Sequence, residues 1–382
     1  TLIFWVISLL YYIYFLVHFY TKTLKKIKKI LIIIQRANGD VLLSHSLIDS
    51  LSNHYQGSII DLLINDDTLP LAKLLPKVNS ILTFSYKKKR DERWMQEKKI
   101  IQKIYRKYDL SINLTASDRS VIYSLISAKR SISAIEKKSQ KSWWKKILLT
   151  HYYFFDIDQH ILVNNLKALN LLNINKVVNN DFPKVPEEIT NKVKLLLERE
   201  KISQFIIFHP SAQYDFKIYP KHLRDELLEN LNTLDIPIII SGSNNKVDLE
   251  IKKDLPKLKN LYDFIGKLTL EEYFALSQLS ISYIGMDTLN MHIASVQNKQ
   301  IFAIFGPTNL SMWSPWSNDQ NAATKENIPL QKYGKVTIFQ SSMPCVACGK
   351  AGCNDNNGRS ECLFTIKPED IFSEIKKSYN DA

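Results

Sequence analysis

Short apolar runs alternate along most of the chain with polar or amphipathic stretches. A run of aliphatic and β-branched residues that ends at a small or polar turn is typical of a buried parallel strand. Such runs predict strands at 29–35, 58–64, 79–84, 110–114, 204–208, 236–241, 281–284 and 301–305. Thr269 followed by Glu272 also predicts a capped helix start. Because polar or helical sequence follows each run, the pattern predicts an α/β fold with parallel sheets.

The N-terminal stretch differs, because residues 2–20 are almost wholly apolar and aromatic. About 20 such residues are needed to cross a bilayer. Lysines follow the run instead of preceding it, which argues against a secretory signal and for a following domain on the cytoplasmic side. We therefore expect residues 1–28 to form a membrane-anchor helix with a basic flank, which spans the bilayer or lies in its interface. A buried N-terminal helix is the alternative.

Charge adds a constraint on partners. The 382 residues are enough for two domains, and 45% hydrophobic with 23% charged residues is a globular composition. The net charge of +13 indicates an anionic partner, such as nucleic acid, an acidic membrane surface or a phosphorylated substrate. Two basic stretches, 87–107 and 129–146, carry tryptophans and suit a lipid or glycolipid surface, although solvated faces are the simpler explanation. No nucleic-acid recognition motif accompanies them, so we expect no nucleic-acid partner.

The stretch 281–316 reads as strand, turn, helix, strand and turn. Asp287 and Thr288 are good residues to begin the helix, and His292 lies one turn later on the same face. A helix N-terminus that carries free N–H groups, a hydroxyl and an imidazole is a good seat for a phosphate. Without further signals, the same residues would more simply be a capped helix with a packed histidine.

The motif DTLNMHIA at 287–294, followed by FGPT at 305–308 and a Trp-x-Pro, resembles the donor-binding signature of glycosyltransferase family 9. That family contains the ADP-heptose:lipopolysaccharide heptosyltransferases. Leu289 and Asn290 stand where the family usually has a glycine and then a small residue or proline. Since the glycine lets the backbone approach the donor, this departure bears on donor geometry and donor identity.

The resemblance extends to other segments. Residues 39–41, Gly-Asp-Val, match the start of the family's first domain, where the aspartate is the proposed catalytic base; Asp40 alone could simply cap a helix. The motif HPSA at 209–212, which contains Ser211, precedes Lys217 in a Lys-x-Tyr-Pro sequence. The corresponding family lysine contacts the donor diphosphate, whereas alone it would be an exposed loop lysine.

The resemblance implies the GT-B arrangement, in which two Rossmann-like domains face each other across a cleft. We expect an N-terminal acceptor domain at 29–180 and a nucleotide-sugar-binding domain at 187–340. Residues 341–382 would form a cysteine-rich loop and a C-terminal helix that packs across the first domain.

The implied activity is an inverting, metal-independent glycosyl transfer that needs no cofactor. Heptose from ADP-heptose would be moved to a lipopolysaccharide or lipooligosaccharide core, an anionic glycolipid, at the cytoplasmic face of the bacterial inner membrane. Asp40 would be the catalytic base. The predicted donor-binding residues are Ser211, Lys217, Asp287, Thr288, Leu289 and His292. Two alternatives are a GT-B transferase with a UDP- or GDP-linked donor, and a membrane-anchored protein that binds anionic polymers without catalysis.

The four cysteines all fall near the C-terminus, at Cys345, Cys348, Cys353 and Cys362. A chain that faces the cytoplasm keeps its thiols reduced. A Cys-x-x-Cys pair with two further cysteines then predicts a structural zinc site. Free thiols or disulfides are the alternatives.

Overall fold

The computed structural model describes residues 27–137, 142–176, 183 and 185–380. The described N-terminal half forms a six-stranded parallel sheet in the Rossmann-type order β3-β2-β1-β4-β5-β6. Its strands are β1 (Lys29–Ile34), β2 (Ile59–Asn65), β3 (Ser80–Phe84), β4 (Tyr108–Asn113), β5 (Ala128–Glu136) and β6 (His151–Phe155). Its helices are α2 (Asn38–Leu42), α3 (His45–His54), α4 (Leu69–Ala72), α5 (Arg90–Ile104), α6 (Asp118–Ser127), α7 (Trp143–Leu148) and α8 (Ile161–Asn170).

The C-terminal half contains a seven-stranded sheet in the order β12-β13-β11-β10-β7-β8-β9, parallel except for the antiparallel β12–β13 edge. Its strands are β7 (Ile206–His209), β8 (Ile238–Ile240), β9 (Leu261–Asp263), β10 (Ser282–Met286), β11 (Gln300–Ile304), β12 (Leu330–Tyr333) and β13 (Val336–Phe339). Its helices are α9 (Glu187–Arg199), α10 (Lys221–Asn232), α11 (Lys246–Lys253), α12 (Leu270–Leu279), α13 (Leu289–Val296), α14 (Leu310–Trp313), α15 (Glu361–Phe364) and α16 (Pro368–Asn380).

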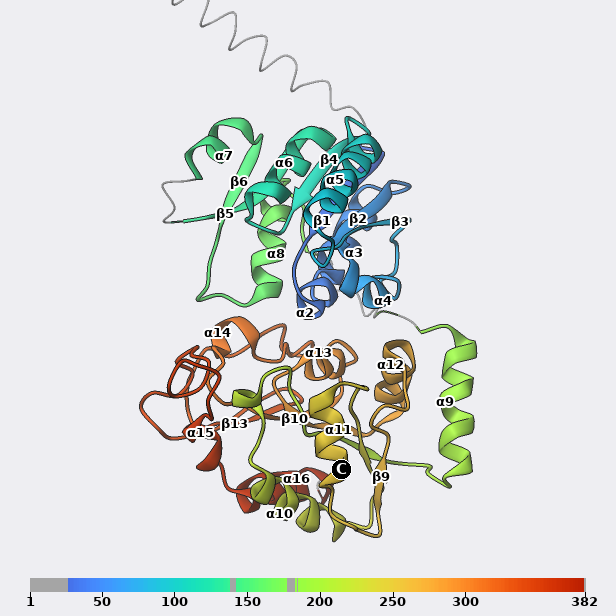
Figure 1. Cartoon of the computed structure of the whole chain (residues 1–382), viewed down its shortest axis with the longest axis vertical. Helices are drawn as coiled ribbons and strands as arrows, with labels where there is room; N and C mark the ends of the chain where they lie inside the picture. The colour runs from blue at the N-terminus through green and yellow to red at the C-terminus, as the bar shows by residue number, and fades with distance from the viewer. Residues whose placement is uncertain (1–26, 138–141, 177–182, 184, 381–382) are drawn as a thin grey trace, which may run out of the picture.

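The two halves meet at one edge of each sheet. Helices α2 and α4, from the upper half in Figure 1, lie against α13 and α12 of the lower half. Since α2 follows β1 and α13 follows β10, the carboxyl ends of the central strands point toward this junction. The prediction of an α/β fold with parallel sheets is therefore confirmed.

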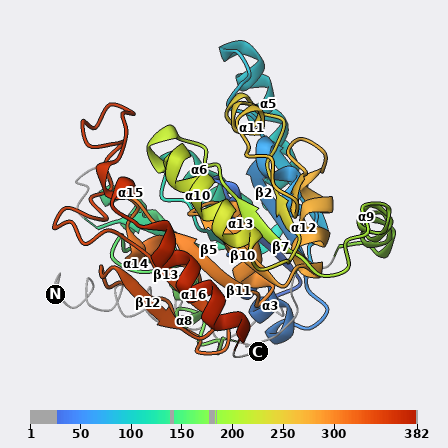
Figure 2. The same cartoon turned by 90° about the horizontal axis from the view of Figure 1, so that it is seen from below.

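Two sequence predictions about packing need correction. The basic stretch at 129–146 contains strand β5, which the sequence did not predict because Lys129 and Arg130 make its start polar; residues 131–135 of the strand are buried. The C-terminal helix does not cross the first domain. Helix α16 packs beside α10 in its own half (Figure 2), because Ile371 and Ile375 are fully buried in that half's core.

Within residues 27–137, 142–176 and 185–380, no helix is both long and apolar enough to cross a bilayer. The predicted anchor at residues 2–20 lies outside the described part of the chain.

Gly285 of β10 lies opposite His209 of β7. A Cβ added at this position would stand 2.4 Å from the carbonyl oxygen of His209. We expect Gly285→Ala to lower the free energy of unfolding by about 3 kcal/mol or more, because neighbouring strands must move apart. Urea unfolding followed by circular dichroism measures this loss.

Gly57→Ala is the matched control. An added Cβ there meets no described atom within 4 Å, so only the positive φ of 76° opposes the change, at a cost of about 1 kcal/mol. Equal losses for the two variants would contradict the packing argument.

Candidate functional site

Asp40 lies in the first turn of α2, directly after the central strand β1. The Arg36 Nε atom lies 2.7 Å from Asp40 Oδ1. Asp40 is only 4% exposed, and this burial raises the pKa of its carboxyl group above the ordinary 3.8, against the opposing effect of Arg36. A buried carboxylate with a raised pKa is suited to accept a proton.

His292 lies one turn into α13, on the other side of the junction. Thr288 is the N-cap residue of this helix, as predicted, but its side chain makes no capping hydrogen bond to the described residues. The Thr288 Oγ1 atom instead lies 3.4 Å from Tyr283 Oη. Burial lowers the pKa of His292 to about 4, so its imidazole is neutral at pH 7.

Lys217 joins the turn after β7 to the turn after β10. It ends a short 3-10 helix, Asp215–Lys217, and its Nζ donates a 3.0 Å hydrogen bond to Asp287 Oδ2. The charges of both Lys217 and Asp287 act on the pKa of His292, so the three side chains form one electrostatic cluster. Lys217 therefore balances the negative charge of Asp287 at this strand edge.

The HPSA turn is tied to the start of α13. His209 Nδ1 lies 3.0 Å from the Ser241 carbonyl oxygen and 3.0 Å from Asn290 Nδ2, while Ser211 Oγ lies 3.4 Å from His209 Nε2. Leu289 is the first residue of α13 and packs, half-buried, against the core. All six predicted donor-binding residues thus come from turns at the carboxyl edge of one sheet or from the helix start that follows.

The Asp40 turn lies next to the His292 helix. A Cβ added at Gly39 would stand 3.5 Å from His292 Cδ2, which is ordinary van der Waals contact. The structure therefore places the turn of Asp40, the candidate base in the N-terminal half, beside the helix that carries His292, a candidate anion-binding residue of the C-terminal half.

Several buried polar atoms at this junction have no hydrogen-bond partner within the described residues. They belong to side chains that follow β1, β10 and β11: Gln35, Asn38, His292 and Thr308. Buried polar groups in folded proteins are nearly always hydrogen-bonded. Unpartnered donors and acceptors at the meeting edges of two parallel sheets are suited to a polar ligand that carries hydroxyl or phosphate groups.

His160 is a residue of this junction that the sequence did not reveal. Its Nε2 donates to the Ser314 carbonyl oxygen at 2.9 Å, because its Nδ1 accepts from the Leu162 N–H. Asn309 Nδ2 also donates to the Ile157 carbonyl oxygen, at 3.3 Å. These bonds join the two halves beside the site. A lone histidine in an apolar and aromatic segment gives no signal of such a role.

The four cysteines are free thiols, and only Cys362 is buried. Its burial, and then the nearby Cys353, Cys348 and Cys345, raise its pKa to about 11. Among the residues that the structure describes, no group of three or more histidine, cysteine or acidic side chains could hold a metal ion. The predicted zinc site stays a prediction.

Comparison with known proteins agrees with the motifs. The profile of glycosyltransferase family 9 (heptosyltransferase) matches residues 98–342. A lipopolysaccharide heptosyltransferase 3 from Escherichia coli is 25% identical over 291 residues, which cover 74% of this chain and 85% of that protein. A lipooligosaccharide heptosyltransferase 2 from Haemophilus ducreyi is 25% identical over 366 residues, or 91% of this chain and 99% of that protein.

Solved structures share the fold. An E. coli ADP-heptose lipopolysaccharide heptosyltransferase II superposes with a TM-score of 0.68 at 19% identity, over 93% of this chain and 100% of that one. An E. coli heptosyltransferase solved with ADP gives a TM-score of 0.67 at 13% identity, over 91% and 99% of the two chains.

The low pKa of His292 leads to a prediction about proton uptake. A nucleoside diphosphate bound beside the imidazole favours its charged form and raises its pKa from about 4. We expect binding of ADP at pH 6 to take up more protons in the wild type than in His292→Asn. Calorimetric titration in two buffers of different ionisation enthalpy measures this number, and the variant corrects for protons on ADP itself. Identical uptake by the two proteins would place the diphosphate away from His292.

Proposed function

This chain belongs to glycosyltransferase family 9, the heptosyltransferases, and we propose that it transfers heptose from ADP-heptose to a lipopolysaccharide or lipooligosaccharide core. Family membership makes it a glycosyltransferase, which favours an enzyme over the non-catalytic alternative. The donor and the acceptor are those that the names of its relatives state. The observation that carries the proposal is the contact between the Asp40 turn and the His292 helix across the two sheets.

The proposed reaction is a single displacement with inversion. Asp40 removes the proton from an acceptor hydroxyl while that oxygen forms a bond to the anomeric carbon. The bond between the anomeric carbon and the phosphate oxygen breaks, and its electron pair leaves with the nucleoside diphosphate. The raised pKa of Asp40 supports this role, because a more basic carboxylate accepts the proton more readily.

The leaving group would be stabilised by groups that are already in place. Lys217 supplies a positive charge, His292 a neutral imidazole, and the start of α13 after Thr288 free backbone N–H groups. Asp287, whose Oδ2 is held by Lys217, would bond sugar hydroxyls or backbone N–H groups through its other oxygen. We assign the charge stabilisation to these residues and not to a divalent ion.

Entry of the substrates requires movement. Asp40 and His292 are both almost completely buried where the halves touch, so a sugar reaches them only when the halves separate. The hydrogen bonds of His160 and Asn309 across the junction would break and re-form in each cycle.

Donor choice depends on the start of α13. Leu289 places a side chain where the family usually has glycine, and Asn290 bonds the HPSA turn. A UDP- or GDP-linked donor is therefore the second candidate. The glycolipid acceptor would place the enzyme at the cytoplasmic face of the inner membrane, held there by residues 1–28 or peripherally.

A panel of nucleotide sugars tests the proposal. Incubation with ADP-heptose, UDP-sugars and GDP-sugars, with and without core acceptor, identifies the donor by release of nucleoside diphosphate.

The variant Asp40→Asn tests the catalytic base. We expect Asp40→Asn to lower turnover by about 10²- to 10⁴-fold, because the amide cannot accept the proton. Donor binding should persist. Asp235→Asn, an exposed aspartate away from the junction, is the control and should keep full turnover.

The same variant has a second expected outcome. A carboxyl group whose folded-state pKa is raised stabilises the fold only at low pH, and that contribution is lost as pH rises through the raised value. Because burial disfavours the ionised form of Asp40, Asp40→Asn should not lower the melting temperature at neutral pH. Unchanged turnover of Asp40→Asn would remove Asp40 from the mechanism.

We propose that the cysteine-rich loop binds a structural zinc ion. To bind it, the loop would have to contract. We expect about one zinc per purified chain by elemental analysis, and a lower melting temperature after chelation. Cys348→Ser should remove the metal while donor turnover at low temperature persists. Four freely titrating thiols in a metal-free, equally stable protein would contradict the proposal.

A further inference from the structure

Helix α7 exposes most of its large apolar side chains and buries a lysine, which is the reverse of an ordinary surface helix. Three of its four large apolar side chains are exposed to solvent, Trp143 by 65%, Ile147 by 70% and Leu148 by 59%, while Trp144 packs partly buried against Val121, Ile135 and Leu149. Its Lys145, in contrast, is only 2% exposed. A helix on a soluble surface normally buries its apolar residues and exposes its lysines. This arrangement leaves an apolar face, Trp143–Ile147–Leu148, without a cover in the described structure.

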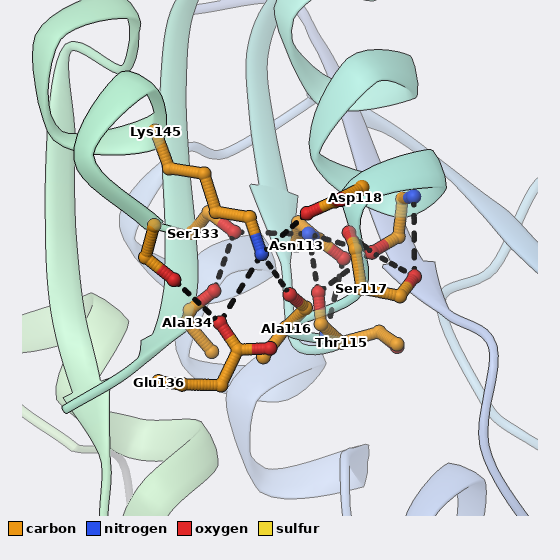
Figure 3. A network of polar contacts seen from close by, with 11 residues as sticks. Asn113, Thr115, Ala116, Ser117, Asp118, Ser133, Ala134, Glu136 and Lys145 are labelled. Carbon is orange, nitrogen blue, oxygen red and sulfur yellow. Dashed lines mark hydrogen bonds and ion pairs between the residues drawn. The ribbon is translucent and has the colours of Figure 1, made fainter. Parts of the chain in front are cut away.

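A network of polar contacts holds α7 in this orientation (Figure 3). The Lys145 Nζ donates to the Ala116 carbonyl oxygen at 2.7 Å and to Glu136 Oε2 at 3.1 Å, and lies 2.9 Å from Asp118 Oδ1. Ser142 Oγ donates to the same Glu136 oxygen at 2.8 Å. These partners come from the loop after β4, the start of α6 and the end of β5. The apolar face is therefore presented by an anchored helix and not by a loose segment.

Two exposed lysines belong to this region. Lys146 lies 5.5 Å above the ring of Phe154, which is itself partly exposed, and Lys137 is exposed at the end of β5. The charge of the whole chain has the same bias. Residues 1–176 carry 28 lysines and arginines against 13 acids, a net +15, whereas residues 177–382 carry 23 against 25, a net −2.

We propose that α7 docks this enzyme on an anionic lipid bilayer. The apolar face would enter the boundary between head groups and acyl chains, a location that tryptophan favours, while Lys146 and Lys137 pair with lipid phosphates. A second copy of the chain fits this face less well, because two N-terminal halves of net +15 repel each other. The inference depends on the proposed function in one respect: it expects the glycolipid acceptor to lie in the same bilayer.

Tryptophan quenching in the full-length protein tests the proposal. Vesicles of phosphatidylethanolamine and phosphatidylglycerol with brominated acyl chains quench tryptophans that enter the bilayer. We expect Trp143→Phe to remove much of this quenching. Trp94→Phe is the matched control, since Trp94 is 71% exposed on α5 of the same half. Unchanged quenching in Trp143→Phe would overturn the proposal, as would a loss seen only in Trp94→Phe, which would assign docking to α5.

Turnover separates this inference from the proposed function. The double variant Ile147→Ser/Leu148→Ser should lose about tenfold or more in turnover on acceptor embedded in vesicles. It should keep full turnover on a de-acylated, water-soluble acceptor. Leu195→Ser, an exposed leucine of α9, should change neither. Equal turnover of the double variant and wild type on embedded acceptor would refute docking through α7. Absence of turnover on both acceptors in the wild type would refute the proposed reaction while the quenching result still decides docking.

Discussion

The close approach of the Gly39 turn to the His292 helix is the constraint on which the site depends. Each sheet presents the carboxyl ends of its central strands at one edge, and the two edges meet at this point. Both residues are buried, and burial raises the pKa of Asp40 and lowers that of His292, which keeps the imidazole neutral. Burial therefore shifts the pKa values of the two groups in opposite directions.

Local sequence was enough to predict the elements that are governed by local interactions. The aliphatic run at 29–35 became β1, and Thr269 with Glu272 forms the reciprocal capping box. A helix start at Thr288 was also predictable, since turn residues follow a buried strand there. The roles given to Asp40 and Lys217 were not, because each alone resembles a common surface residue. Those assignments came from resemblance to a family and stay predictions; the structure adds only that the Asp40 turn lies beside the His292 helix.

The remaining features depend on contacts between distant segments. His160 bonds Ser314 across 154 residues, and no spacing in the sequence encodes such a pair. The sequence showed helix α7 only as a basic stretch with two tryptophans. Its orientation depends on the acceptors of Lys145, which lie after β4 and at the end of β5. The half against which α16 packs likewise depends on distant residues, namely those of the apolar cluster that buries Ile371 and Ile375.

The uneven division of charge between the halves has an effect before any contact is made. Because one half is strongly basic and the other is close to neutral, the molecule has a large electric dipole along the line that joins them. Near a negatively charged surface such a dipole experiences a torque that turns the basic half toward that surface. Over distances of about one Debye length, roughly 8 Å in physiological salt, rotational diffusion is thereby biased, and an encounter begins with the molecule already oriented.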